Sequence, residues 1–471
     1  MDQRGTTGAH ADATTVAGVT TEFEPDVMDL LVKALRRAVG SEFSAVGTDT
    51  LLGELVLGDT EAGGAIAPGT RKAGSLSGMI FGRAGRGWVS DDEVRSVSAG
   101  AGAGAFAGAA AGGGACAGAD EESHQEADER EVDAAWREAR WRFGLGSRGS
   151  AAERSRALPG MTGAMRVCLL LALRAARVEG TISVRCRHVA RALLDLPDTR
   201  AREALLLQRL DTAASATALD ALDASAPAEN EGPESRGVTL LRRAGTLGRS
   251  GNRLTRALTS WTSGASENGS PVLFAVTVEA VRQAVRRGRT VAEPVDLLLG
   301  TLALDRALSV AGRSLPGSLA DANAAPALLR RYGVRQVSLV SSASATDSDS
   351  VAVPGGSETR LSAAADRTMA VARLSAAEHG SPTVGTIHLL SALLDDSATH
   401  TATATDTATR AATHTATATD TDADTATATY TATDTDTDPG VGAGGAVVRM
   451  LAADRVDIAA LRAELRRGLG A

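Results

Sequence analysis

Four short leucine-rich segments recur along this chain of 471 residues, and each follows a longer amphipathic stretch. The segments occupy residues 51–55, 189–194, 297–302 and 389–394. In the stretch before the first segment, the apolar residues fall at steps of three and four, which places them on one face of a helix. They are Val27, Leu30, Leu31, Ala34, Leu35, Ala38 and Val39. A recurring pattern of this kind predicts repeated helical units that bury their apolar faces against one another.

Three of the units agree in register without a gap. Counting from Phe23, Met161 and Leu361, small residues recur at the same two positions. These residues are Ala34, Ala172 and Ala372, followed by Ala38, Ala176 and Ala376. The third unit is predicted to be a degenerate copy that starts near 276–280. Its helix would be shorter by about two turns, a change that leaves the buried face nearly unrotated.

The second half of a unit is clearest at the C-terminal end. Val447, Val448 and Leu451 predict one short helix, and the spacing of apolar residues over 458–469 predicts another. A unit is therefore expected to contain four helices. Five hydroxyl residues stand where helices should begin, and each is predicted to be an N-cap. They are Thr48 and Thr386 before the short helices, and Thr162, Thr277 and Ser362 before the long ones.

This arrangement resembles the Clp repeat of the N-terminal domains of Clp-family unfoldases. The family turn G-T-E-H-L-L-L-x-L-L is matched by V-G-T-I-H-L-L-S-A-L-L at 384–394 and by V-G-T-D-T-L-L-G-E-L at 46–55. The resemblance covers the blocks 23–57, 161–222, 276–340, 361–394 and 440–469. It implies an all-α fold with two Clp N-type domains, each a pair of four-helix repeats.

Composition suggests how the domains are separated. Aromatic residues make up only 3% of the chain and Gly reaches 51, so long segments lack the apolar side chains of a core. We expect a disordered N-terminus at 1–22, a first domain at 23–225, a linker at 226–269 and a second domain at 270–471. The first domain would carry an Ala/Gly-rich insertion at about 96–120, and the second a disordered Thr/Ala/Asp-rich insertion at 398–438.

The formal net charge of −8 argues against a nucleic-acid-binding protein, because such proteins neutralise phosphates with a basic surface. Two arginine clusters, Arg286–Arg287–Arg289 and Arg466–Arg467, are expected to be solvated helix faces. Residues 1–21 lack the apolar run of a signal peptide, and the uncharged stretch at 96–119 lacks the large apolar residues that drive membrane insertion. We therefore expect a cytoplasmic protein that binds no membrane.

Clp unfoldases hydrolyse ATP in modules whose nucleotide-binding loop ends in Gly-Lys-Ser/Thr. Neither lysine here, Lys33 or Lys72, follows a glycine. The only close Cys–His pair, Cys186 with His188, lies at the turn of a repeat, where the family motif has its histidine. The histidines show no regular metal-ligand spacing. We expect no enzyme activity, no cofactor and no metal.

Some family members bind phosphorylated arginine through an acidic residue at the third position of G-T-E-H, aided by hydroxyls at the start of the long helix. Only Asp49 keeps an acid at that position, and Glu24 replaces the hydroxyl at the helix start. The resemblance implies four candidate ligand-binding residues: Thr48, Asp49, Thr386 and His388.

The function expected from this resemblance is non-catalytic binding of peptides or proteins. The chain would act as an adaptor or regulator of a Clp chaperone–protease system, with Clp components or their substrates as partners. Two alternatives stay open. One is a sensor of a small molecule or of modified arginine, and the other is a scaffold that acts through its low-complexity arms.

Overall fold

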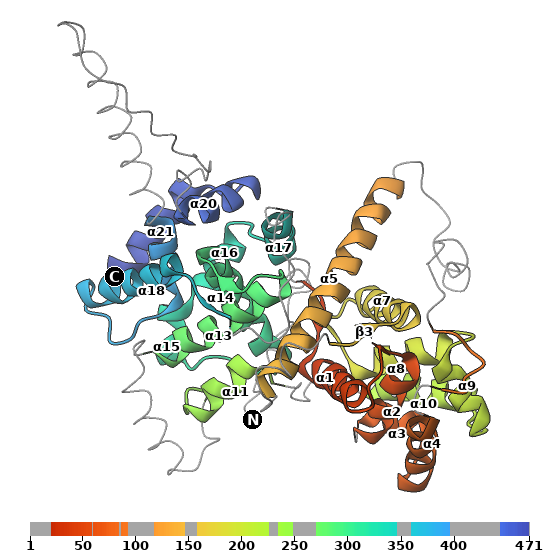
Figure 1. Cartoon of the computed structure of the whole chain (residues 1–471). Helices are drawn as coiled ribbons and strands as arrows, with labels where there is room; N and C mark the ends of the chain where they lie inside the picture. Colours follow the sequence, from red (N-terminus) through yellow and green to blue (C-terminus); the bar gives the residue numbers. More distant parts are fainter. Residues whose placement is uncertain are drawn as a thin grey trace, which may run out of the picture.

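The computed structural model describes residues 20–58, 60–83, 86–92, 117–146, 158–225, 234–247, 270–345, 359–395 and 443–470. Over these residues the protein is all-helical, as the sequence predicts, and its strands are only two residues long. Figure 1 shows the long helix α5 (Ala117–Gly146) running between two groups of helices. One group comes from residues 25–225 and the other from residues 236–470.

Each repeated unit contains a long helix of 16 residues: α1 (Pro25–Gly40), α7 (Gly163–Val178), α13 (Pro271–Arg286) and α18 (Ala363–Glu378). The hydroxyls of Thr162 and Ser362 accept hydrogen bonds from backbone N–H groups in the first turns of α7 and α18. These bonds satisfy amides that have no partner within the helix. Both predicted caps are confirmed.

The third long helix begins earlier than the sequence predicts. Ser270 is its cap and accepts a hydrogen bond from the backbone N–H of Leu273. Thr277 lies inside the helix, where its hydroxyl donates to the carbonyl of Leu273. The predictions of a Thr277 cap and of a shortened helix were wrong. The signal for the true start is Pro271, because proline at the first helical position has no N–H that needs a partner.

A second helix follows each long one: α2 (Thr48–Leu57), α8 (Cys186–Asp195), α14 (Pro294–Val310) and a helix at 386–395. In each of the four units, the residue before the long helix and the residue before the second helix are 23 positions apart. These pairs are Glu24 and Gly47, Thr162 and Arg185, Ser270 and Glu293, and Ser362 and Gly385. The four units therefore share one backbone register.

Short parallel strands pair neighbouring units, and in the first half this pairing is reciprocal. β1 (Glu22–Phe23), before α1, pairs with β4 (Ser183–Val184), before α8. β2 (Ala45–Val46), before α2, pairs with β3 (Gly160–Met161), before α7. In the second half, β5 (Val291–Ala292), before α14, pairs with β6 (Arg360–Leu361), before α18. Each pairing thus brings the start of a long helix in one unit beside the start of the second helix in the neighbouring unit.

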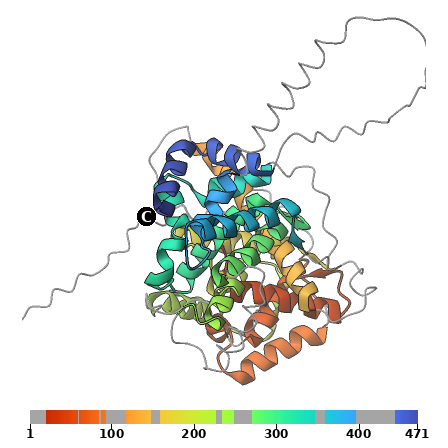
Figure 2. The same ribbon diagram turned by 90° about the vertical axis from the view of Figure 1, so that its left-hand side faces the viewer.

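The remaining helices complete two apolar cores. They are α3 (Glu61–Ile66), α4 (Thr70–Arg83), α9 (Arg200–Leu207), α10 (Thr212–Ser225), α11 (Arg236–Arg243), α15 (Gly317–Ala320), η2 (Asp321–Asn323), α16 (Ala325–Arg331), α17 (Gln336–Ala345), α20 (Ala443–Ala453) and α21 (Ile458–Gly470). The first core gathers buried side chains from Phe23 to Leu219, and the second from Val238 to Leu465. Figure 2 shows α20 and α21 at the opposite end of the molecule from α4. Helices at 443–453 and 458–470 confirm the prediction for the last unit.

Three features depart from the sequence prediction. Helix α5 was not predicted, and it begins inside the segment assigned to the Ala/Gly-rich insertion. Helix α11 lies inside the segment 226–269 assigned to a linker, and its Val238 and Leu241 are buried in the second core. Glu22, assigned to the disordered N-terminus, is only 1% exposed because arginines of α13 and α14 pair with it. Residues 1–19, 96–116 and 398–438 lie outside the described part of the chain.

Candidate functional site

Thr48 and Asp49 open α2 directly after Gly47. A Cβ atom on Gly47 would lie 2.5 Å from Asp49 Oδ1 and 2.9 Å from Asp92 Oδ2, so any larger residue at position 47 would displace these two carboxylates. The side chain of Thr48 does not cap its own helix, and that prediction was wrong. Its hydroxyl instead accepts a hydrogen bond from the backbone N–H of Ala201, in the first turn of α9, over 3.1 Å.

Asp92 is the central group of this site and was not singled out from the sequence. It is fully buried, and its carboxylate accepts hydrogen bonds from the backbone N–H and the hydroxyl of Thr48 over 2.7 and 2.9 Å. It also accepts a bond of 2.9 Å from the backbone N–H of Arg200, at the start of α9. A carboxylate at a helix N-terminus is favoured by the free amides and the helix dipole. Asp92 therefore occupies the place where the starts of α2 and α9 would otherwise receive an anion.

Asp49 is 2% exposed, and its Oδ1 has no hydrogen-bond partner. Burial raises the pKa of this carboxyl, and the nearby charge of Asp92 raises it further, to about 6. The Arg200 guanidinium opposes the shift without cancelling it. Two neighbouring buried carboxyls repel an added anion, so this arrangement disfavours a phosphate group.

Thr386 and His388 lie in the second half, at the start of the helix at 386–395. The backbone N–H of Gly385 donates to Nδ1 of His388 over 3.1 Å, and that of Thr386 donates to Asn323 Oδ1 over 3.0 Å. Burial lowers the pKa of His388, which keeps the ring neutral and able to accept. His388 therefore acts as a capping residue. The hydroxyl of Thr386 has no hydrogen-bond partner, so it is not the predicted cap.

The structure does not unite the four predicted ligand-binding residues. Thr48 makes its polar contacts with Asp92 and α9 in the first half, whereas Thr386 contacts Asn323 in the second. Each pair instead marks one junction between neighbouring units.

Cys186 and His188 form no thiolate–imidazole pair. Burial raises the pKa of the Cys186 thiol, and the carboxylates of Asp26 and Glu24 raise it further, so the thiol is uncharged at neutral pH. Nδ1 of His188 accepts from the backbone N–H of Arg185 over 2.8 Å, and Nε2 lies 2.9 Å from Glu179 Oε2. Both ring nitrogens are therefore engaged in structural contacts. His188 repeats the capping role of His388.

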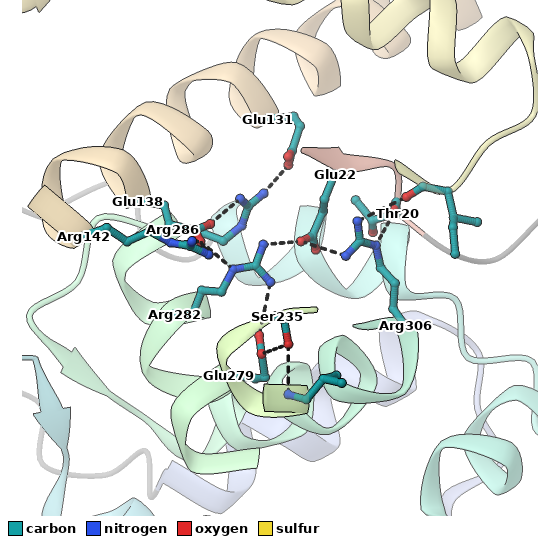
Figure 3. Close-up of polar contacts among 12 residues, drawn as sticks. Thr20, Glu22, Glu131, Glu138, Arg142, Ser235, Glu279, Arg282, Arg286 and Arg306 are labelled. Carbon is teal, nitrogen blue, oxygen red and sulfur yellow. Dashed lines mark hydrogen bonds and ion pairs between the residues drawn. The ribbon is translucent and has the colours of Figure 1, made fainter. Parts of the chain in front are cut away.

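A second cluster of charged side chains joins the two halves (Figure 3). Arg282 on α13 lies 2.6 Å from Glu22, 2.8 Å from Glu138 on α5 and 3.2 Å from Glu279 on its own helix. One turn later, Arg286 pairs with Glu138 over 3.0 Å and with Glu131 over 2.5 Å. The side chains of these two arginines and of the glutamates are at most 9% exposed.

The pKa values of the carboxylates in this charged cluster shift in different directions. Burial alone would raise the pKa of Glu22, but Arg306, Arg282 and Arg286 outweigh it and lower the pKa to about 2. Glu138 is likewise held ionised, with its pKa well below the usual range, by Arg282 and neighbouring arginines. For Glu131 the desolvation dominates, and its pKa is raised. These buried ion pairs join residues of the two halves.

The expectation that Arg286 and Arg287 form a solvated helix face was wrong. Arg287 pairs with Asp296 over 2.7 Å, and its side chain is 5% exposed. The other predicted solvated pair, Arg466 and Arg467, is exposed as expected. The first cluster is buried because carboxylates on other helices, Glu131 and Asp296, pair with it, and the local pattern of charges does not reveal these contacts.

Among the described residues, no helix combines the length and apolar character needed to cross a bilayer, and no group of His, Cys, Asp or Glu is placed to hold a metal ion. Comparison with known proteins adds no assignment: no family model, curated protein or solved structure matches the chain.

Proposed function

We propose that this chain is a non-catalytic, cytoplasmic binding protein of the Clp-repeat type, with two N-type domains and no ATPase module. It would bind peptides or protein partners as an adaptor or regulator of a Clp chaperone–protease system. The observation that carries the proposal is the 23-residue spacing shared by all four units.

Pairing between neighbouring units supports the same proposal. The backbone N–H of Thr162 donates to the carbonyl of Val46, and that of Glu24 donates to the carbonyl of Val184. These equivalent bonds relate the first and second units by approximate twofold symmetry. Ser362 donates its backbone N–H to Ala292 in the same way in the second half. Such pairing between neighbouring units is what a tandem helical repeat would produce.

The junction geometry argues against the modified-arginine alternative. Asp92 already fills the amide-lined position at the starts of α2 and α9, and Asp49 lies beside it. A phosphorylated arginine would have to displace Asp92 and bring its phosphate beside Asp49. Protein or peptide recognition by helical surfaces outside this junction is therefore the favoured function.

The test uses the full purified chain with purified Clp unfoldase and protease subunits. Co-elution in size-exclusion chromatography, together with a changed rate of ATP-dependent substrate degradation, supports the adaptor function. Neither a complex nor a change in rate at micromolar concentrations contradicts it. In a parallel measurement, phosphoarginine peptide is titrated into the parent, Asp49→Asn and the exposed control Asp29→Asn. Binding that Asp49→Asn alone abolishes would establish the modified-arginine alternative instead.

A further inference from the structure

The long helices α7 and α18 occupy equivalent places in the second and fourth units. Thr162 and Ser362 cap them at the same position, so the two helices share one register. The residues that face the core correspond position by position, and all are at most 1% exposed. They are Met165, Leu169 and Ala172 on α7, and Ala365, Met369 and Ala372 on α18. The outer faces of the two helices can therefore be compared residue by residue.

The outer face of α7 is covered by α5, which runs beside it (Figure 1). Leu170 on this face is 6% exposed and belongs to the first apolar core, to which α5 also contributes. Arg166 pairs with Asp133 of α5 over 3.1 Å, and Arg174 pairs with Asp128 of α5 over 3.6 Å. In the first half, this face of a long helix is thus the binding surface for another helix.

The corresponding face of α18 is exposed and apolar. Leu374 stands where α7 has Arg174, and it is 60% exposed. Val371 is 42% exposed, and Ala370 and Ala377 are exposed on the same side of the helix. Figure 1 shows α18 at the outer edge of the second group of helices, away from α5. A helix face in water normally carries polar side chains, so this apolar stripe favours contact with a partner.

The charges of this face differ from those of the face that α5 covers. Asp366 stands where α7 has Arg166, the residue that pairs with Asp133 of α5. A second copy of α5 would bring Asp133 against Asp366 and Asp128 against Leu374, so α5 itself does not fit. A complementary helix carries a basic side chain opposite Asp366 and an apolar one opposite Leu374.

We propose that the outer face of α18 is a docking surface for an amphipathic helix of a protein partner. The helix lies on α18 as α5 lies on α7, with an apolar side chain against Leu374 and a basic side chain beside Asp366. The inference rests on the proposed protein-binding function and names a surface for it. It does not involve the Asp49 junction.

The probe is a peptide of residues 125–146, taken from α5, that carries Asp128→Leu and Asp133→Arg. The unsubstituted peptide is its control, and binding to the full chain is measured by fluorescence polarisation of the labelled peptides. We expect saturable binding of the substituted peptide and about tenfold weaker binding of the unsubstituted one, because the latter places two carboxylates against Leu374 and Asp366.

A substitution in the chain locates the site of binding. Leu374→Asp should weaken binding of the substituted peptide by about tenfold, because it places a charge in an apolar contact. Leu206→Asp is the matched control, since Leu206 is 61% exposed on α9 in the first half. It should bind the peptide as the parent does, and both variants should keep the parent melting temperature.

A charge swap tests the role of Asp366. Asp366→Arg should weaken binding of the doubly substituted peptide by about threefold, the effect of an exposed ion pair. A further peptide carries Asp128→Leu alone and so keeps Asp133. It should bind the Asp366→Arg chain about threefold more tightly than it binds the parent.

Four results would overturn the proposal. They are no binding of the doubly substituted peptide, unchanged affinity in Leu374→Asp, a charge swap without effect, and a dimer of the parent chain that Leu374→Asp dissociates in analytical ultracentrifugation. The last result would assign the surface to a second copy of the chain. No Clp subunit is present in this test, so a lack of peptide binding contradicts the docking surface alone. A lack of any complex with Clp subunits contradicts the adaptor function alone.

Discussion

At the scale of single residues, Asp49 makes the folding stability of the protein depend on pH. Its pKa rises from 3.8 to about 6 in the folded state, first through burial and then through Asp92. The folded state therefore holds this proton more tightly than the unfolded chain does. The resulting stabilisation is fully present below about pH 4 and is lost as the pH rises through 6.

Asp49→Asn removes this penalty, because the amide has no charge to desolvate. We expect the variant to be more stable than the parent at pH 7, by about 1–2 kcal/mol, and equally stable near pH 4. Thermal unfolding at both pH values measures the difference. The exposed Asp29→Asn serves as the control and should change neither value. A loss of stability at pH 7 in Asp49→Asn would mean that the ionised carboxylate is needed.

A substitution at Leu390 tests whether the leucine-rich segments form a buried core, as the sequence predicts. Leu390 is 2% exposed within the second apolar core. Leu390→Asp should cost several kcal/mol and unfold the second half, since it buries an unpaired charge. Leu374→Asp is the matched control, because Leu374 is 60% exposed on α18. Denaturant unfolding followed by circular dichroism measures both. Equal midpoints for the two variants would contradict the packing described here.

At the scale of elements, the close approach of α13 and α14 depends on Gly300. A Cβ there would lie 2.7 Å from the backbone N of Ala280 and 2.8 Å from the carbonyl oxygen of Val276. Backbone atoms cannot move aside as a flexible side chain can. We expect Gly300→Ala to destabilise the protein by about 1–3 kcal/mol, although alanine is the better helix former.

Gly78→Ala is the control for Gly300→Ala. Gly78 lies in α4 with open space where the new methyl would stand. Its replacement should stabilise the protein by about 0.5–1 kcal/mol through helix propensity alone. Opposite signs in chemical denaturation would establish that packing decides the effect at Gly300. A stabilising Gly300→Ala would show that the two helices can separate without cost.

At the scale of the whole molecule, we expect the buried charged cluster to hold the two halves in contact. Arg282→Met leaves Glu22, Glu138 and Glu279 without their shared cation in a buried site. We expect a loss of about 3–5 kcal/mol, and a larger radius of gyration in small-angle X-ray scattering as the halves separate. The exposed Arg466→Met should leave both measurements unchanged. A compact, equally stable Arg282→Met would show that apolar contacts alone hold the halves.

Local periodicity was enough to predict the helical class, the last two helices, and the caps at Thr162 and Ser362. These features depend on neighbours within one or two turns, so the sequence carries them directly. The same reasoning failed for the third unit, because an unbroken apolar run at Val272–Val276 hides the start of α13. The sequence pattern does not predict helix α5, because charged residues at its buried positions interrupt any apolar face.

The sequence by itself determined the amphipathic helices of the repeated units and the caps of α7 and α18, but not α5, α11 or the start of α13. Tertiary structure alone decided which charges are buried and which helix starts face each other. Glu22 and Arg282 are separated by 260 residues, and Asp92 reaches Arg200 across 108. Helix formation depends on contacts three and four residues apart, whereas the environment of a charge depends on all the chain that folds around it.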